Sequence, residues 1–201
     1  MGVLVGRQAP DFTAAAVLGN GEIVEGYNFA EATKGKKAVV FFYPLDFTFV
    51  CPSELIAFDH RLEEFTKRGV EVIGVSIDSQ FSHNAWRKTA VENGGIGEVG
   101  YALVADVKHD ICQAYDVEHP EAGVAFRASF LIDEDGLVRH QVVNDLPLGR
   151  NIDEMLRMVD ALNFHQEHGE VCPAGWEEGK KGMDASPEGV AAFLSENAEG
   201  L

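Results

Sequence analysis

Short apolar runs alternate with amphipathic stretches along this chain, as expected for strands and helices in turn. Residues 36–43 (KKAVVFFY) are typical of a buried strand. Residues 52–67 place apolar side chains three and four positions apart, which predicts one helix, and residues 70–77 (VEVIGVSI) form a second apolar run. This order predicts a βαβ unit in which the two strands are parallel.

The second half of the chain repeats the alternation more loosely. We expect helices over 82–92, 107–115 and 151–164. We expect strands over 101–105, 124–133 and 137–143. The last two strands are joined by the tight-turn sequence DEDG, which predicts a hairpin. Together these elements predict an α/β protein of thioredoxin-like order, with a central mixed β-sheet flanked by helices.

The chain changes character after residue 164. Residues 165–189 are polar and rich in glycine, and Cys172 lies there outside any periodic element. A short helix is expected near 187–197, because Pro187 favours a helix start. We therefore predict a thioredoxin-like domain over 1–164 and a C-terminal arm over 165–201 that carries Cys172.

Composition narrows the classes of function. The chain has 201 residues, of which 46% are apolar, and a net charge of −17 from 33 acidic and 16 basic residues. This charge disfavours binding to nucleic acid, whose phosphates attract Lys and Arg, and to anionic membrane surfaces. No apolar run reaches the roughly 18 residues of a membrane span, and the first residues do not resemble a secretory signal. A soluble, cytoplasmic protein is expected.

The chain has three isolated cysteines, too few for a disulfide scaffold and without the spacing of a metal site. Cys112 lies beside Ile111 and Tyr115 on an expected helix, so we interpret it as a buried structural thiol. The seven histidines are scattered, and most are expected on the surface. The GGIG sequence at 94–97 does not satisfy the dinucleotide-binding pattern GxGxxG, so no cofactor is expected.

Cys51 is the candidate nucleophile. It lies where an apolar strand turns into a helix, and the unpaired N–H groups and dipole of a helix start favour the thiolate. The thiolate is the reactive form of cysteine. Thr48, three residues earlier, can place a hydroxyl near the sulfur. The alternative is that Cys51 is a small buried core residue, and local pattern alone leaves both interpretations open.

Several longer stretches carry a family resemblance. PLDFTFVCPSE at 44–54 resembles the active-site motif PxxxTxxC of the peroxiredoxins. EVCPAGW at 170–176 resembles the resolving-cysteine motif of their typical two-cysteine class, which includes the peroxidase component of bacterial alkyl hydroperoxide reductase and the thioredoxin peroxidases. Further matches occur in the same order at 76–86, 126–133 and 144–150.

The resemblance implies a thiol peroxidase that reduces hydrogen peroxide and organic hydroperoxides, in antioxidant defence and redox homeostasis. Cys51 would become a sulfenic acid, which Cys172 would resolve as a disulfide between two subunits. Thr48 would hold the thiolate and the peroxide, Arg127 would stabilise the negative charge, and Pro44 would keep water from the sulfur.

Glu54 and Arg150 match positions that the family uses to orient the arginine of the pocket. The alternative is an ordinary surface salt bridge between them, worth at most about 1 kcal/mol. Arg127 lies within the apolar sequence VAFRASF, where a charge requires a partner or a purpose.

The resemblance also implies partners. The family resolves its disulfide within a homodimer and often assembles five dimers into a ring. Phe81, Ser82, His83 and Trp86 match its dimer–dimer contact, although Phe81 and Trp86 are equally compatible with a core position. The oxidised enzyme would be reduced by an external dithiol donor, and the sequence leaves open whether this is thioredoxin or a flavoprotein disulfide reductase.

Two other functions compete with the peroxidase. A thioredoxin-like disulfide reductase requires CxxC, but Thr48 and Glu54 occupy the positions three residues from Cys51. A holdase chaperone remains compatible as a second activity. Phe193-Leu194 stands where over-oxidation-sensitive members carry Tyr-Phe, so we expect intermediate sensitivity to sulfinic acid formation.

Overall fold

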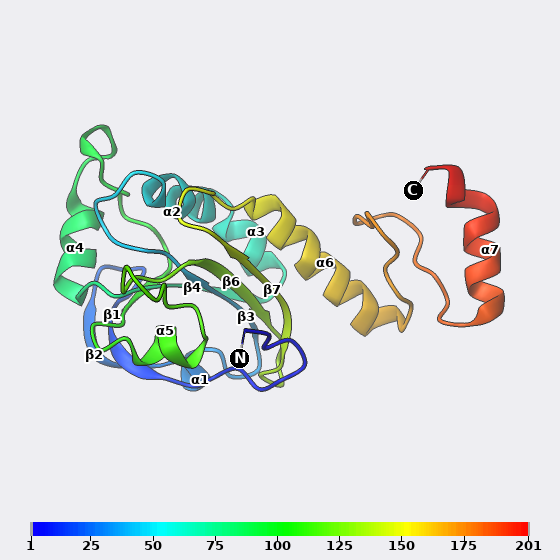
Figure 1. Cartoon of the computed structure of the whole chain (residues 1–201), viewed down its shortest axis with the longest axis horizontal. Coiled ribbons are helices and arrows are strands. Elements are labelled where there is room, and N and C mark those ends of the chain that lie inside the picture. The colour runs from blue at the N-terminus through cyan, green and yellow to red at the C-terminus, as the bar shows by residue number, and fades with distance from the viewer. Residues whose placement is uncertain (1, 201) are drawn as a thin grey trace. The chain divides into compact units, whose positions relative to one another are not determined.

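The computed structural model describes residues 2–200 (Figure 1). The strands are β1 (Thr13–Val17), β2 (Ile23–Asn28), β3 (Lys37–Phe42), β4 (Val70–Ser76), β5 (Ala102–Ala105), β6 (Arg127–Ile132) and β7 (Val138–Asn144). The helices are α1 (Phe29–Ala32), α2 (Cys51–His60), α3 (Leu62–Lys67), α4 (Gln80–Lys88), α5 (Asp110–Ala114), α6 (Ile152–His168) and α7 (Pro187–Asn197), with 3₁₀ turns η1 (Val91–Asn93) and η2 (Ala198–Gly200).

The strands form one sheet in the order β2-β1-β5-β4-β3-β6-β7. β3 runs parallel to β4, and β4 parallel to β5, whereas β6 is antiparallel to β3 and to β7. The predicted mixed sheet, the parallel pair and the hairpin are confirmed. Since α2 follows the carboxyl end of β3, the start of this helix lies at the edge of the sheet where parallel strands commonly carry a site.

Neighbouring aromatic residues of β3 show how the sheet is covered on both faces. Side chains alternate along a strand, so Phe41 and Phe42 point to opposite faces. Phe41 stacks on Phe58 of α2, with ring centroids 4.1 Å apart. Phe42 packs against Tyr115, next to α5, at 5.1 Å. One face is thus covered by α2 and the other by α5, and Phe41 and Phe42 are both fully buried.

Two predicted helices differ from the observed ones in where they start or break, and the helix expected over 151–164 continues to His168. The single helix expected over 52–67 is broken at Arg61, whose backbone leaves the helical region (φ −110°, ψ 5°) and whose N–H bonds back to Phe58 O. The helix expected over 82–92 instead covers Gln80–Lys88, because Ser79 caps its start and Thr89 adopts an extended conformation. Both differences arise at helix ends, where local hydrogen bonds decide the boundary.

The chain divides into two compact units, one up to Ile152 and one from Asp153. In the second unit, an irregular segment follows α6 and forms an antiparallel bridge between Val171 and Met183. α7 begins after the cap residue Ser186, as the helix predicted over 187–197, and it has no buried residue. The predicted domain boundary between 164 and 165 stays a prediction.

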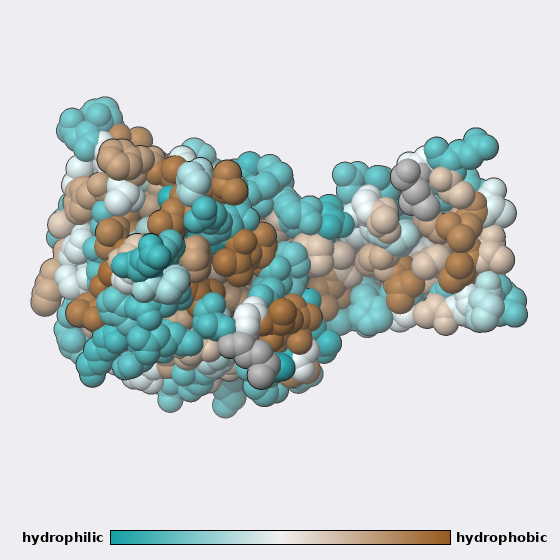
Figure 2. All heavy atoms as spheres, in the orientation of Figure 1, coloured by the Kyte–Doolittle hydropathy of each residue, from teal (hydrophilic) through white to brown (hydrophobic). Residues whose placement is uncertain are grey.

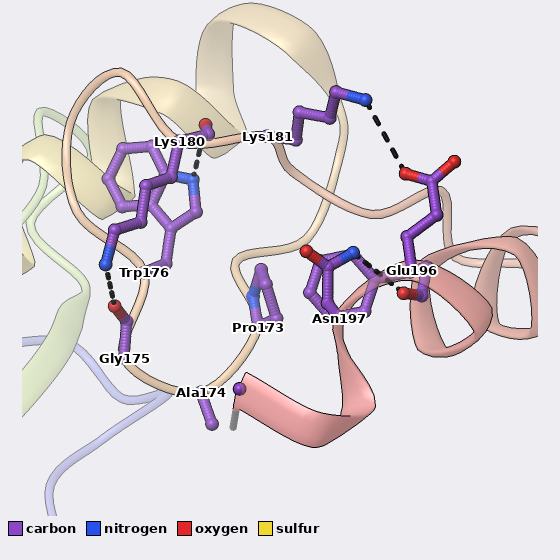
Figure 3. A pocket seen from close by; sticks show the side chains of 10 residues that line it. Pro173, Ala174, Gly175, Trp176, Lys180, Lys181, Glu196 and Asn197 are labelled. Carbon is purple, nitrogen blue, oxygen red and sulfur yellow. Dashed lines mark hydrogen bonds and ion pairs between the residues drawn. The ribbon is translucent and has the colours of Figure 1, made fainter.

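The second unit contains a hollow of about 560 Å³ beside α7 (Figure 3). Pro173 and Trp176 line it from the segment that carries Cys172, and Glu196 and Asn197 line it from α7. Lys181 forms an ion pair with Glu196 at 3.7 Å, and both side chains are mostly exposed. The packing of α7 within this unit is therefore loose compared with the close-packed aromatic core of the first unit.

The molecular surface combines hydrophilic and hydrophobic side chains. On the face drawn in Figure 2, hydrophilic side chains dominate and hydrophobic ones appear as separate patches. Within residues 2–200, no helix combines the length and the apolar character that crossing a membrane requires.

Candidate active site

Cys51 is the first residue of α2, and its side chain is fully buried. The chain leaves β3, passes the buried Pro44 and forms the loop 44–50 that leads into this helix. Pro52 lies in the first turn, where a backbone N–H would have no partner within the helix, so the absence of this group costs no hydrogen bond. The sulfur therefore lies at the positive end of the helix dipole, which favours a negative charge on it.

Thr48 contacts the sulfur directly. Its Oγ1 lies 3.0 Å from Cys51 Sγ and 2.8 Å from the carbonyl oxygen of Leu45. A hydroxyl has one hydrogen to donate but two acceptor lone pairs. When the sulfur is a thiolate, it competes with Leu45 O for that hydrogen, and the lone pairs of Thr48 are left to accept a hydrogen bond from a substrate.

Arg127 contacts the sulfur as well. This first residue of β6 is buried, and its Nη1 lies 3.2 Å from Cys51 Sγ. The same Nη1 lies 2.8 Å from Glu54 Oε2, and Nε donates to Leu146 O at 2.6 Å. A guanidinium fixed by two oxygen acceptors holds its positive charge against the sulfur, and this favours the thiolate.

Glu54 joins the two arginines. Its Oε1 accepts from the backbone N–H and from Nε of Arg150, both at 2.9 Å, and its Oε2 accepts from Arg150 Nη2 at 3.0 Å. The side chains of Glu54 and Arg150 are only 2% exposed. Interpreting this pair as an ordinary surface salt bridge is therefore wrong. The pair is a buried network, in which each charge depends on the others.

The charges in this network shift one another. Burial alone raises the pKa of Glu54, but hydrogen bonds and charge from Arg150, together with the charge of Arg127, outweigh it and lower that pKa from 4.5. Burial lowers the pKa of Arg127, but Cys51 and Glu54 outweigh this effect and raise it. Both groups therefore stay ionised at neutral pH.

Cys172 belongs to the second compact unit, and its thiol has a different environment from that of Cys51. Its half-buried thiol donates to Ala161 O across 3.4 Å. Burial raises the pKa of Cys172, and the charge of Arg157 opposes this shift only in part. Cys51, Cys112 and Cys172 are all free thiols.

Cys112 has the environment expected of a structural thiol. It is fully buried in the hydrophobic core, and its backbone N–H donates to Asp106 Oδ2 at 2.7 Å. Burial, together with the charge of Asp106, raises the pKa of this thiol strongly. The interpretation of Cys112 as a buried structural residue is confirmed.

The structure brings Thr48, Arg127, Glu54 and Arg150 together around Cys51, directly or through one intermediate group. Sequence reasoning missed a second buried polar group next to this site, formed by Asp46 and His83. Most of the histidines were expected on the surface, and His83 is an exception that is fully buried. One signal was present: Asp46 is a charge inside the apolar sequence PLDFTF, the same kind of anomaly that drew attention to Arg127.

Comparison with known proteins fixes the family. The profile of the AhpC/TSA family matches residues 5–141, which is most of the chain. The chain belongs to the AhpC/TSA family of peroxiredoxins. The profile of the C-terminal domain of 1-Cys peroxiredoxin matches residues 161–196 of the same chain, the segment that carries Cys172.

Relatives of this peroxiredoxin are similar over nearly their whole length. Alkyl hydroperoxide reductase C of Buchnera aphidicola subsp. Schizaphis graminum is 56% identical, covering 95% of this chain and 96% of the relative. That of Helicobacter pylori is also 56% identical, over 98% of both chains. The crystal structure of the reduced 2-Cys peroxiredoxin of Plasmodium vivax superposes with a TM-score of 0.92 at 46% identity, covering 96% of this chain and 99% of that one.

This peroxiredoxin is a thiol-dependent peroxidase, as its relatives are. The predicted family, thioredoxin-like fold and enzyme class are confirmed.

Proposed function

We propose that this peroxiredoxin reduces hydrogen peroxide and organic hydroperoxides at Cys51 and resolves the product with Cys172 of a second copy. The observation that carries the proposal is the position of Cys51 Sγ at a helix start, 3.0 Å from Thr48 Oγ1 and 3.2 Å from Arg127 Nη1. One neighbour offers both a donor and an acceptor, and the other offers a fixed positive charge. Both favour attack by a thiolate.

In the first step, the thiolate of Cys51 attacks one peroxide oxygen and the O–O bond breaks. The leaving oxygen takes the electron pair of that bond and a proton, and it departs as water or an alcohol. Cys51 retains the other oxygen as a sulfenic acid. Thr48 accepts a hydrogen bond from the hydroperoxide, and Arg127 stabilises the charge that develops on the oxygens.

Pro44, Glu54 and Arg150 act on this step indirectly. Pro44 is buried at the start of the loop and keeps water from the sulfur. Glu54 holds Nη1 of Arg127 at 2.8 Å, and Arg150 fixes Glu54 through three hydrogen bonds. The guanidinium is thus preorganised before peroxide enters, which costs no reorganisation during the reaction.

In the second step, the thiolate of Cys172 attacks the sulfenic sulfur, water leaves, and a disulfide forms. An external dithiol then supplies two electrons and two protons to restore both thiols. We propose thioredoxin or a flavoprotein disulfide reductase as this donor. The name of the relatives, alkyl hydroperoxide reductase C, supports organic hydroperoxides among the substrates.

We propose a homodimer as the working unit, with assembly of five dimers into a ring, and a cytoplasmic location. Exposed aromatic side chains support an oligomer. Phe49 is 99% exposed, Phe81 66% and Phe47 53%, although large apolar side chains normally avoid water. Phe47 and Phe49 flank Thr48, so a partner covering them would also enclose the peroxide site.

Single-turnover oxidation tests the proposal. Wild type, Cys51→Ser, Cys172→Ser and the matched control Cys112→Ser are each mixed with one equivalent of hydrogen peroxide or cumene hydroperoxide, and each thiol is assigned by mass spectrometry. We expect rapid oxidation at Cys51 in every variant that retains it, and none in Cys51→Ser. Rapid peroxide consumption by Cys51→Ser would overturn the proposal.

A further inference from the structure

A second buried polar group lies directly before Thr48 in the chain. The Asp46 carboxylate is almost fully buried and receives three side-chain contacts. Tyr43 Oη donates to its Oδ1 at 2.9 Å, Ser82 Oγ donates to its Oδ2 at 2.7 Å, and His83 Nδ1 lies 2.9 Å from Oδ2. A buried carboxylate is costly unless its oxygens are satisfied in this way.

The ring of His83 faces an oxygen on each side. Nδ1 faces Asp46, and Nε2 lies 3.2 Å from the carbonyl oxygen of Val104 in β5. The ring therefore connects the Asp46 carboxylate to the backbone of β5 through its two nitrogens. His83 therefore ties the loop to α4 and to the sheet at once.

The backbone on either side of Asp46 is held as well. Its N–H donates to Asp78 Oδ2 at 2.9 Å. The next residue, Phe47, has a positive φ of 53°, which is a strained conformation for a bulky side chain. Such strain persists only where surrounding contacts over-determine it, and the contacts of Asp46 provide that constraint. Thr48 follows immediately, with its hydroxyl 3.0 Å from Cys51 Sγ.

We propose that Asp46 and His83 are positioning residues for the peroxidase reaction: they fix the strained turn at Phe47 and thereby aim the Thr48 hydroxyl at Cys51. This inference rests on the proposed function of Cys51. Neither residue touches the sulfur, and the contact between Arg127 and Cys51 does not depend on them. Losing the pair should therefore weaken peroxide activation by Thr48 while the thiolate remains available.

A double-mutant cycle tests this coupling. The rate constant of Cys51 oxidation by hydrogen peroxide is measured by stopped flow for wild type, Asp46→Asn, Thr48→Val and the double variant. We expect Asp46→Asn to slow the reaction by about tenfold in wild type, since small displacements of a reacting group are costly. In the Thr48→Val background we expect the rate constant to fall by less than about a further twofold, because the effects of residues that act through one another are not additive.

Alkylation of Cys51 by iodoacetamide provides the second readout. It reports the nucleophilic thiolate without peroxide, so Asp46→Asn should leave its rate within about twofold of wild type. An equal loss in both backgrounds, or an equal fall in alkylation, would overturn the inference. A wild type that does not react with peroxide at Cys51 would instead overturn the proposed function, and the inference with it.

Two more variants test whether a change in rate arises from a general effect on folding. Tyr115→Phe removes another tyrosine hydrogen bond, to Pro10 O at 3.0 Å, which is partly buried and far from this loop in the sequence. This variant should leave the peroxide rate unchanged. If Asp46→Asn does not fold, Ser82→Ala removes a single donor to the same carboxylate. We expect it to slow the reaction by about threefold, again only when Thr48 is present, and a loss independent of Thr48 would contradict the coupling.

Discussion

The two cysteines that we propose take part in the reaction have contrasting environments. Cys51 is fully buried at the start of a helix, between a hydroxyl and a guanidinium that is fixed by Glu54. Cys172 is half-buried on an irregular segment and has one long hydrogen bond, to Ala161 O. A helix start, a hydroxyl and a fixed positive charge surround the first sulfur, whereas burial raises the pKa of the second thiol.

This difference suggests how the two steps are divided between the units. The first unit preorganises charge around one sulfur, which suits a fast reaction with a small substrate. The second unit has little buried apolar surface in α7 and few contacts around its sulfur, the properties of a region with low local stability. In the proposed mechanism, such a segment would leave its resting place to meet the sulfenic acid of a second copy.

The largest effect is expected from removing the charge beside Cys51. Arg127→Gln loses the guanidinium that faces the sulfur, so the rate constant with hydrogen peroxide should fall by about 100-fold or more in stopped-flow measurements. Arg139→Gln is the matched control, because Arg139 also pairs with a carboxylate, but that carboxylate belongs to Asp133 and not to Glu54. A fall of less than about threefold for Arg127→Gln would mean that the fixed positive charge beside Cys51 contributes little to its reaction with peroxide.

Glu54 tests the buried network through stability. Glu54→Gln leaves two arginines short of a negative partner, and should lower the free energy of unfolding at pH 7 by about 3 kcal/mol, measured by urea denaturation. The pKa of Glu54 is lowered on folding, so its stabilisation is present above the ordinary value of 4.5 and is lost as the pH falls through the folded value. The difference between variant and wild type should therefore shrink on acidification.

Glu64→Gln is the control for this experiment. Glu64 pairs with Lys67 and Arg68 on the surface of α3, where solvent screens the charges, so a much smaller change is expected. If Glu54→Gln and Glu64→Gln lowered the free energy of unfolding equally, this would contradict the account of a buried network.

Cys172 should impose a pH dependence on the second step. Burial raises its pKa, so at neutral pH it is mostly a thiol, and the thiolate fraction grows up to tenfold per pH unit. We expect disulfide formation after peroxide oxidation to accelerate by up to about tenfold per unit between about pH 6 and about pH 8. Arg157→Gln removes the opposing charge and should slow this step at a fixed pH. A rate independent of pH would mean that movement of the segment, not the thiolate, limits resolution.

The smallest effect concerns the stability of the second unit. Ser186 accepts a hydrogen bond from Gly189 N at 3.0 Å and caps α7. Ser186→Ala should cost about 1 kcal/mol of local stability, seen as faster amide exchange confined to α7. Ser195→Ala, in the same helix but not at its cap, should change exchange much less. Faster exchange across the first unit as well would contradict the independence of the two regions.

The sequence predicted the interior strands because their apolar runs are long. β3 and β4 are almost entirely buried and were identified from their apolar patterns alone. β1 and β2 were not identified, since TAAAV is weakly patterned and IVEGYN forms an exposed edge strand with little periodicity. The break at Arg61 was also missed, because the apolar spacing continues across it.

Sequence motifs identified most residues of the candidate site, but they did not show that these residues are buried. The resemblance identified Thr48, Arg127, Glu54 and Arg150, and the structure brings all four to the region of Cys51. Burial of these charges depends on tertiary packing, which no local pattern shows. The pair of Asp46 and His83 was missed for the same reason: the two residues are 37 positions apart and meet only because α4 packs against the loop.

The most direct test of the central claim is a complementation experiment with the two cysteine variants. Cys51→Ser and Cys172→Ser are mixed, allowed to exchange subunits, treated with one equivalent of hydrogen peroxide and separated on a non-reducing gel. The account predicts that neither variant alone forms a Cys51–Cys172 bridge, whereas the mixture forms one disulfide-linked dimer with a Cys51–Cys172 peptide detectable by mass spectrometry. Wild type that forms this bridge within a single chain, together with a mixture that forms none, would contradict it.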